Sequence, residues 1–281
     1  MNVGKAFRAE WLKLRKRPAV WILWSALFLL VLLFGYVAMW AATAQVPPEV
    51  TRGPEVAFLL ERLSLASMPA YVASLVSVFG TAFGLILGAL AVGSEYGWGT
   101  VKTMTTQQPG RVALAGGRAL ALLVVCVLLA LMAFLGGAAG AGLVSLLQST
   151  GTTPPDAADA ATAFGVAVLI IALWCALGVC FATLFRGSGW AIGFGLLYAF
   201  ALELLLGQVP LQGRAGELLT DALINNNTAA LVAWLSPVGL DALGGTTALD
   251  IAPGTAVTVL TAYLGIALLV ATAVSARRDI A

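Results

Sequence analysis

Histidine is absent from this chain of 281 residues, and charged residues make up only 10% of it. Without histidine, the chain cannot carry a Ser-His catalytic pair or a histidine-liganded metal site. Soluble domains carry about 25% charged residues. The low charge, with 60% hydrophobic residues and a mean hydropathy of +0.98, therefore places the chain among integral membrane proteins.

Cysteine is also scarce, and the three residues of this type lie inside apolar runs: Cys126, Cys175 and Cys180. Cysteines in apolar helices behave as small hydrophobic residues. Their odd number and their positions indicate neither a disulfide framework nor a metal cluster. We expect no catalytic residues and no bound metal in this chain.

Long hydrophobic runs fill most of the sequence. Six of them reach the length of about 20 residues that a helix needs to cross a bilayer. The predicted spans are 19–42, 72–93, 119–147, 161–185, 190–209 and 255–275. The third is long enough to tilt or to extend beyond the membrane. The pattern predicts an all-α membrane protein in which residues 1–281 form a single transmembrane domain.

The distribution of basic residues predicts the orientation of these spans. The segments on the N-terminal side of the membrane hold 12 of the 15 Lys and Arg residues, whereas those on the opposite side hold nine of the 13 acidic residues. Since Lys and Arg are enriched in cytoplasmic segments, both termini are expected to be cytoplasmic.

Residues 1–18 precede the first span and have a helical pattern. An apolar stripe is formed by Val3, Phe7, Trp11 and Leu14, and the opposite side carries Lys5, Arg8, Arg15 and Lys16, although Leu12 breaks the pattern. A basic amphipathic helix of this kind lies in the plane of the membrane interface. It could serve only to set the topology, or it could have a further role.

The longest connection on the opposite side, 210–254, contains three consecutive asparagines and a semi-apolar stretch from 229 to 243 that Pro237 interrupts. The stretch is too short to span the bilayer, so we expect a pair of short helices that dip partway into the outer leaflet. In the spans, glycines recur at every fourth position, as in Gly80, Gly84 and Gly88, which allows helices to approach closely in lipid.

A polar segment, residues 94–111, separates the second and third spans and contains Glu95 directly after the second span. Gly97 and Gly99 bracket a tryptophan and allow a sharp change of direction. Thr100 can cap a short helix that Pro109-Gly110 would end. The alternatives are a cytoplasmic coupling helix and an ordinary solvated loop.

The order of these residues resembles the permease subunits of ABC-2 type transporters. The resemblance rests on Glu95, Gly99-Thr100, Gln108-Pro109-Gly110-Arg111 and Gly117-Arg118, and on the sequence EWLKLRK at 10–16 before the first span. Arg118 is a mild departure, because family members often carry lysine there.

The resemblance implies a six-helix domain of a bacterial cell membrane that dimerises with a second permease copy or a homologue and binds separate ATPase subunits. ATP and Mg would be bound by those partners, because this chain contains no G-x-x-x-x-G-K-[ST] phosphate loop. An interfacial helix and a coupling helix are part of this implied fold. The implied ATPase-coupling residues are Glu95, Gly97, Gly99, Thr100, Lys102, Gln108 and Arg111. Nucleic acid is not an expected partner.

Glu203 lies deep in the fifth span, about 20 Å along the helix from its start. An acidic residue in a membrane span should face the bundle interior or a wet cavity. Glu203 is therefore expected either to lie on a translocation path, to hydrogen-bond an external helix, or to be a paired or protonated structural residue.

Two function classes remain open beside an ATP-driven exporter of drug-, peptide- or lipid-like molecules. An ion- or proton-coupled secondary transporter would normally carry more charged residues in its spans and an internal repeat. An intramembrane enzyme would need a catalytic set that the spans lack. The sequence therefore favours a transport subunit, and it does not identify the substrate.

Overall fold

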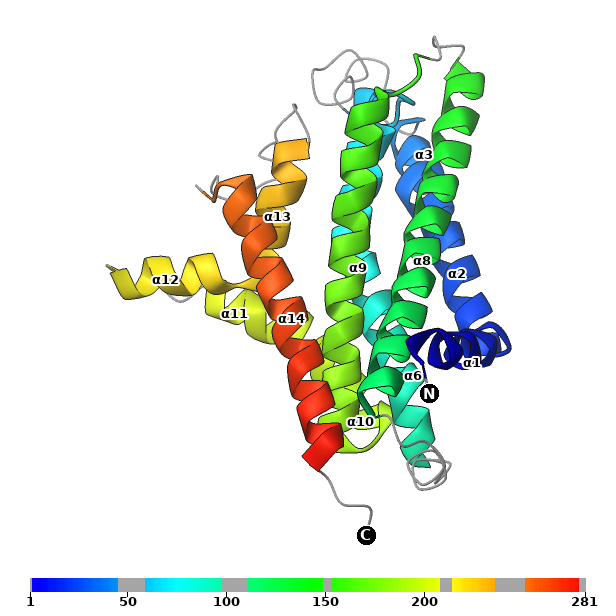
Figure 1. Ribbon diagram of the computed structural model, residues 1–281. Helices are drawn as coiled ribbons and strands as arrows, with labels where there is room; N and C mark the ends of the chain where they lie inside the picture. The colour runs from blue at the N-terminus through cyan, green and yellow to red at the C-terminus, as the bar shows by residue number, and fades with distance from the viewer. Residues whose placement is uncertain are drawn as a thin grey trace.

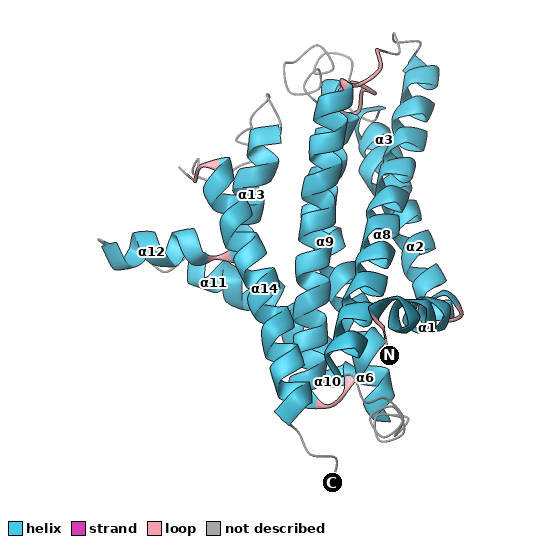
Figure 2. Ribbon diagram, in the orientation of Figure 1, coloured by secondary structure: helices cyan, strands magenta, loops and turns pink. Residues whose placement is uncertain are grey.

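The computed structural model describes residues 2–44, 59–97, 111–148, 153–207, 214–235 and 251–277, and every regular element in these ranges is a helix. Figures 1 and 2 show long helices standing side by side, with α1 lying across them. The helices, in chain order, are α1 (Val3–Arg15), α2 (Pro18–Leu30), η1 (Val31–Ala38), α3 (Met39–Ala44), α5 (Met68–Leu75), η2 (Val76–Gly80), α6 (Thr81–Gly97), α8 (Arg111–Gln148), α9 (Ala157–Phe185), α10 (Ser188–Leu197), η3 (Tyr198–Leu202), α11 (Glu203–Gly207), α12 (Arg214–Ala222), α13 (Ile224–Leu235) and α14 (Pro253–Arg277).

Six continuous helical stretches are long and apolar enough to cross a membrane, which confirms the number of spans predicted from the sequence. They are Pro18–Thr43, Met68–Tyr96, Ala113–Gln148, Ala157–Phe185, Ser188–Gly207 and Pro253–Ser275. Each predicted range overlaps one of them. The third is part of α8, whose 38 residues exceed what a hydrocarbon core about 30 Å thick requires.

The centre of the bundle is the contact between α6 and α9, and glycine makes it possible. A Cβ atom on Gly84 would lie 2.6 Å from the carbonyl oxygen of Ile171, and one on Gly88 or Gly178 would overlap the facing backbone. The two backbones can approach this closely only because these positions lack a side chain. The core beside this contact includes Trp174 and Ile171, both fully buried.

Three of the spans contain a short π-helical stretch, η1, η2 and η3. Such stretches change the hydrogen-bonding pattern and shift the side chains around the helix. In η1, the carbonyl oxygen of Gly35 accepts a hydrogen bond of 2.7 Å from the Tyr71 hydroxyl of α5. This bond and the edge-to-face contact of Tyr36 with Tyr71 hold the first two spans together.

The region 210–254 does form two short helices in its described part, but they begin earlier than the sequence pattern suggested. They are α12 and α13, and residues 236–250, which include Pro237, lie outside the described residues. Helix α13 lies beside α14, and α12 extends outward from the bundle, at the left of the view in Figure 1. The three cysteines are free and buried.

Candidate functional site at the α1 end of the bundle

Four charged side chains from three helices meet where α1 crosses the spans. Glu10 and Lys13 belong to α1, Glu95 lies near the end of α6, and Arg118 lies near the start of α8. The two carboxylates are almost fully buried, with side chains 4% and 6% exposed. The side chains of Lys13 and Arg118 are 22% and 19% exposed to solvent. We call these four residues the charge ring.

The charges in this ring alternate, so that each cation contacts both anions. Lys13 Nζ lies 2.8 Å from Glu10 Oε2 and also pairs with Glu95. Arg118 Nη2 donates to both carboxylate oxygens of Glu95, at 2.9 and 2.8 Å, and lies 3.3 Å from Glu10 Oε1. The four formal charges sum to zero, which makes their shared burial tolerable.

The electrostatics of Glu10 follow from this arrangement. Burial by itself raises the pKa of a carboxyl group, but the positive charges of Arg118 and Lys13, with their hydrogen bonds, outweigh it and lower the pKa of Glu10 below 4.5. Glu10 is therefore ionised at neutral pH.

The helix backbones also meet closely around the ring. A Cβ atom on Gly117, next to Arg118, would lie 2.7 Å from the backbone nitrogen of Phe7 in α1. A Cβ atom on Gly93 would lie 2.5 Å from the backbone nitrogen of Ser188, where α10 begins. The end of α6 is thus held by α1 on one side and by α10 on another.

Arg17, in the short connection between α1 and α2, adds a further link to α6. Its Nη1 donates to the carbonyl oxygen of Leu90 at 3.0 Å and to that of Ala91 at 3.4 Å. Burial lowers the pKa of Arg17, and the nearby Glu95 and Glu10 partly offset this effect. The hydrogen bonds fix the position at which the first span leaves α1.

The helical wheel of residues 1–18 was only partly correct about which residues face the bundle. The buried residues of α1 are Ala6, Glu10 and Leu14, whereas Val3 is 41% exposed. The stripe contained Leu14 and omitted Glu10, because a charged residue does not contribute to an apolar pattern. The signal that could have found Glu10 is its position within the EWLKLRK sequence.

The expected coupling residues are described only in part. Glu95 is a member of the charge ring, and Gly97 is the last residue of α6. Arg111 is the first residue of α8, although its side chain lies outside the described part. Gly99, Thr100, Lys102 and Gln108 also lie outside the described residues, as does the helix predicted there.

A second polar site lies around Glu203, away from the charge ring. The carboxylate accepts hydrogen bonds from the backbone nitrogens of Ile224 (3.1 Å) and Asn225 (2.7 Å), at the start of α13. The Tyr198 hydroxyl lies near this carboxylate, and the Asn225 side chain donates to the carbonyl oxygen of Ala199. A carboxylate at a helix N-terminus satisfies donors that lack an intrahelical partner.

The three asparagines noted in the sequence complete this second site. Asn226 Nδ2 donates to the Thr220 carbonyl oxygen, and Asn227 Nδ2 donates to those of Asp221 and Leu223. They fix the junction of α12 and α13. The sequence did not show that Glu203 and this asparagine run are neighbours.

With both sites described, comparison with known proteins decides the family. A model of the ABC-2 family transporter proteins matches residues 6–202, which include the charge ring, the first four spans and most of the fifth. The chain belongs to the ABC-2 transporter family. It is therefore a multi-pass transport protein of a membrane. No curated protein matches the chain.

Proposed function

We propose that this ABC-2 family protein is the membrane-spanning permease subunit of an ATP-driven exporter, and that a separate polypeptide hydrolyses ATP. Both termini and residues 98–110 are cytoplasmic in this proposal, as the distribution of Lys and Arg predicts. The protein resides in a bacterial cell membrane. The chain itself binds no nucleotide; ATP and Mg belong to the partner.

The observation that carries this proposal is the charge ring. Residues 98–110 connect α6 to α8, so any partner that moves this segment pulls on Glu95 at one end and Arg118 at the other. The two residues are bound to each other and to α1. Displacement of the segment would then move α1, α6 and α8 together, and would not merely bend one of these helices.

The mechanism that follows is mechanical. Closure of two ATPase subunits would draw their docking surfaces together and shift the segment at 98–110. Helix α6 would transmit the shift to α9 through the glycine contact of Gly84 and Gly88 with the facing backbone, because close-packed backbones cannot yield independently. The helices would thereby move as a unit around the path of the substrate.

A second permease copy or a homologue completes the proposed transporter. In the most apolar 18 residues of the first, fifth and sixth spans, only 28%, 22% and 17% of the residues are buried. These helices therefore have free apolar surface for a second transmembrane domain as well as for lipid. Glu203 and its α13 partner stay candidates for the translocation path.

The proposed cargo is drug-, peptide- or lipid-like, because an apolar bundle is better suited to amphipathic molecules than to sugar polymers. An ion- or proton-coupled secondary transporter is the alternative, and it would transport without an ATPase. Dependence of transport on ATP and on the partner separates the two.

The test uses the chain reconstituted in vesicles with its cognate ATPase. We expect Glu95→Gln to abolish most transport and substrate-stimulated ATP hydrolysis while the complex still assembles. The matched control is Arg8→Gln, which removes a charge from the exposed side of α1. Normal coupled activity of the Glu95 variant would refute the mechanism, and transport without ATP would refute the function.

A further inference from the structure

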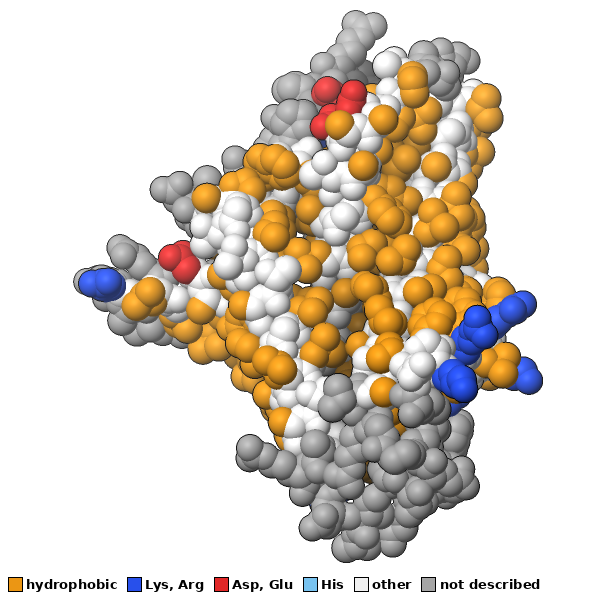
Figure 3. Space-filling model, in the orientation of Figure 1, with side chains coloured by type: hydrophobic (Ala, Val, Ile, Leu, Met, Phe, Trp, Pro, Cys, Tyr) orange, Lys and Arg blue, Asp and Glu red, His pale blue; other side chains and the backbone are white. Residues whose placement is uncertain are grey.

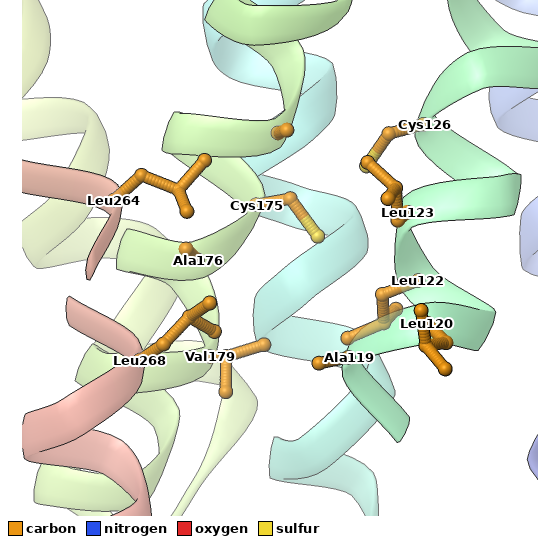
Figure 4. A pocket seen from close by; sticks show the side chains of 11 residues that line it. Ala119, Leu120, Leu122, Leu123, Cys126, Cys175, Ala176, Val179, Leu264 and Leu268 are labelled. Carbon is orange, nitrogen blue, oxygen red and sulfur yellow. The ribbon is translucent and has the colours of Figure 1, made fainter. Parts of the chain in front are cut away.

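An apolar groove opens between α8, α9 and α14, alongside residues 119–126 of α8. Its floor is formed by α9, with Cys175, Ala176 and Val179; Leu264 and Leu268 of α14 form one wall, and Ala119 to Cys126 of α8 form the other (Figure 4). The volume is about 170 Å³. All 11 lining residues are apolar or cysteine.

The groove opens on the outer surface of the bundle, which is largely hydrophobic along the spans (Figure 3). Leu120 and Leu123, on its α8 wall, are 48% and 45% exposed, whereas Cys126 and Cys175 at its base are almost fully buried. The space in the groove exists because three of its lining residues have small side chains: Ala119, Ala172 and Ala176. Pockets for whole drug-sized ligands measure about 300–1,000 Å³, so this one accommodates a segment of hydrocarbon chain and not a complete drug molecule.

A basic residue, Arg186, lies beyond the end of this groove. Arg186 follows the last residue of α9 and is exposed, and it has no ion pair or hydrogen bond with any other described residue. Ala172 and Val179, spaced by seven residues, lie on one face of α9, and Arg186, the left-handed C-terminal cap of this helix (φ 55°), follows seven residues after Val179. Arg186 therefore stands about 10 Å beyond Val179, towards the α1 end of the bundle.

We propose that the groove binds one acyl chain of an anionic phospholipid and that Arg186 binds its phosphate. The lipid belongs to the leaflet at the α1 end, which is the cytoplasmic leaflet in the orientation proposed above. Arginine is suited to this contact, because its planar guanidinium donates two parallel hydrogen bonds to a phosphate. The spacing of Arg186 from the groove matches a lipid, whose charge lies at the interface and whose chain extends inward.

This proposal is independent of ATP-driven transport and is tested without the ATPase. The probes are phosphatidylglycerol and phosphatidylcholine analogues that carry a diazirine midway along one acyl chain. The full-length chain in nanodiscs is irradiated with each probe, and the labelled peptides are located by mass spectrometry. We expect labelling to concentrate on the groove peptides, with phosphatidylglycerol favoured over phosphatidylcholine by about tenfold.

Two classes of variant separate the chain contact from the headgroup contact. Ala176→Phe fills the floor, and Ala119→Phe fills the wall from another helix, so that failure of one variant to insert leaves the other. Each should lower groove labelling about tenfold. The control is Ala262→Phe on the exposed side of α14, which should leave labelling unchanged. Arg186→Gln should abolish the preference for phosphatidylglycerol but keep phosphatidylcholine labelling.

Three results would overturn the proposal. Labelling spread evenly over all lipid-facing helices would show that the groove holds no particular chain. Undiminished labelling in the two filled variants would show the same. Both lipids carry a phosphate, but in phosphatidylcholine the choline cation offsets its charge. Equal labelling by the two lipids in the unaltered chain, or an unchanged preference in Arg186→Gln, would therefore show that Arg186 does not select an anionic headgroup and only balances the C-terminal dipole of α9.

Discussion

Arg118 and Glu95 lie on consecutive spans, 23 residues apart, and one nitrogen of the arginine donates to both oxygens of the carboxylate. The same nitrogen also lies 3.3 Å from Glu10 of α1, 108 residues away along the chain. Arg118 thus joins three helices that the sequence keeps far apart. Buried ion pairs add little net stability but fix one arrangement of their helices.

The first prediction distinguishes a ring of four charges from a simple pair. The double variant Glu95→Arg with Arg118→Glu restores the attraction between these two positions. It also places each new charge beside a charge of its own sign, Lys13 or Glu10. We therefore expect the double variant to remain as inactive in coupled ATP hydrolysis as Glu95→Arg alone.

Exchanging the α1 charges as well, by Glu10→Lys and Lys13→Glu, recreates the alternating order with all signs inverted. This fourfold variant should recover part of the coupled activity, but not all of it, because Arg17 would then lie near cations at positions 95 and 10. Recovery in the double variant alone would show that Lys13 and Glu10 are not part of the functional unit.

The second prediction concerns the pH dependence of α1 docking. The pKa of Glu10 is lower in the folded chain than the usual 4.5, so its stabilising effect is complete above pH 4.5 and is lost as pH falls through the lower folded value. Hydrogen exchange of the amides of α1, measured between pH 7 and 3 and corrected for the intrinsic rate, should show loss of protection only in the acidic part of this range.

Glu10→Gln should remove this pH dependence and weaken docking at neutral pH by about 3–5 kcal/mol, the usual effect of breaking a buried pair. Arg8→Gln, on the exposed side of α1, should retain the profile of the unaltered chain. A profile that Glu10→Gln leaves intact would mean that another group controls the docking of α1.

The spans were predictable from sequence because hydropathy requires no knowledge of neighbours: a run of about 20 apolar residues is a span whatever it packs against. The partners of Glu95 and Glu203 could not be predicted from sequence. A buried charged residue indicates that a partner exists, but not which residue it is. Arg118 and the start of α13 supply those partners from sites 23 and 21 or 22 residues away. The glycine spacing of α6 indicated a close helix contact, and only the structure identified α9 as the neighbour.

The third prediction tests that helix contact. Gly88→Ala places a methyl group against the backbone of Cys175 in α9. Overpacking in a close-packed interior costs about 1–3 kcal/mol, so thermal unfolding of the purified chain in detergent should shift to a lower temperature. Coupled transport should fall too, since α6 and α9 would be forced apart.

Gly165→Ala is the matched control, because it makes the same change within α9 at a position where a Cβ atom would meet nothing within 4 Å. Alanine there should be neutral or should stabilise the helix by about 0.5–1 kcal/mol. Equal destabilisation by both variants would show that the loss arises from helix flexibility and not from the contact with α9.

The last prediction concerns Glu203, whose carboxylate accepts hydrogen bonds from two backbone nitrogens at the start of α13. Glu203→Leu places an apolar side chain in the span and leaves the two backbone donors without this acceptor, at a cost of about 1–3 kcal/mol for a buried unsatisfied donor such as the Ile224 nitrogen. Amides of Ile224–Leu235 should then exchange faster, while those of α6 and α9 should not change.

Two control variants accompany this one. Glu203→Gln retains one acceptor oxygen and should show a smaller effect, and Asp221→Asn, which removes an exposed charge one turn earlier, should show none. If Glu203→Leu leaves exchange in α13 unchanged but stops transport, Glu203 acts on the cargo and not on the helix; if both change together, the carboxylate acts by holding α13 in place.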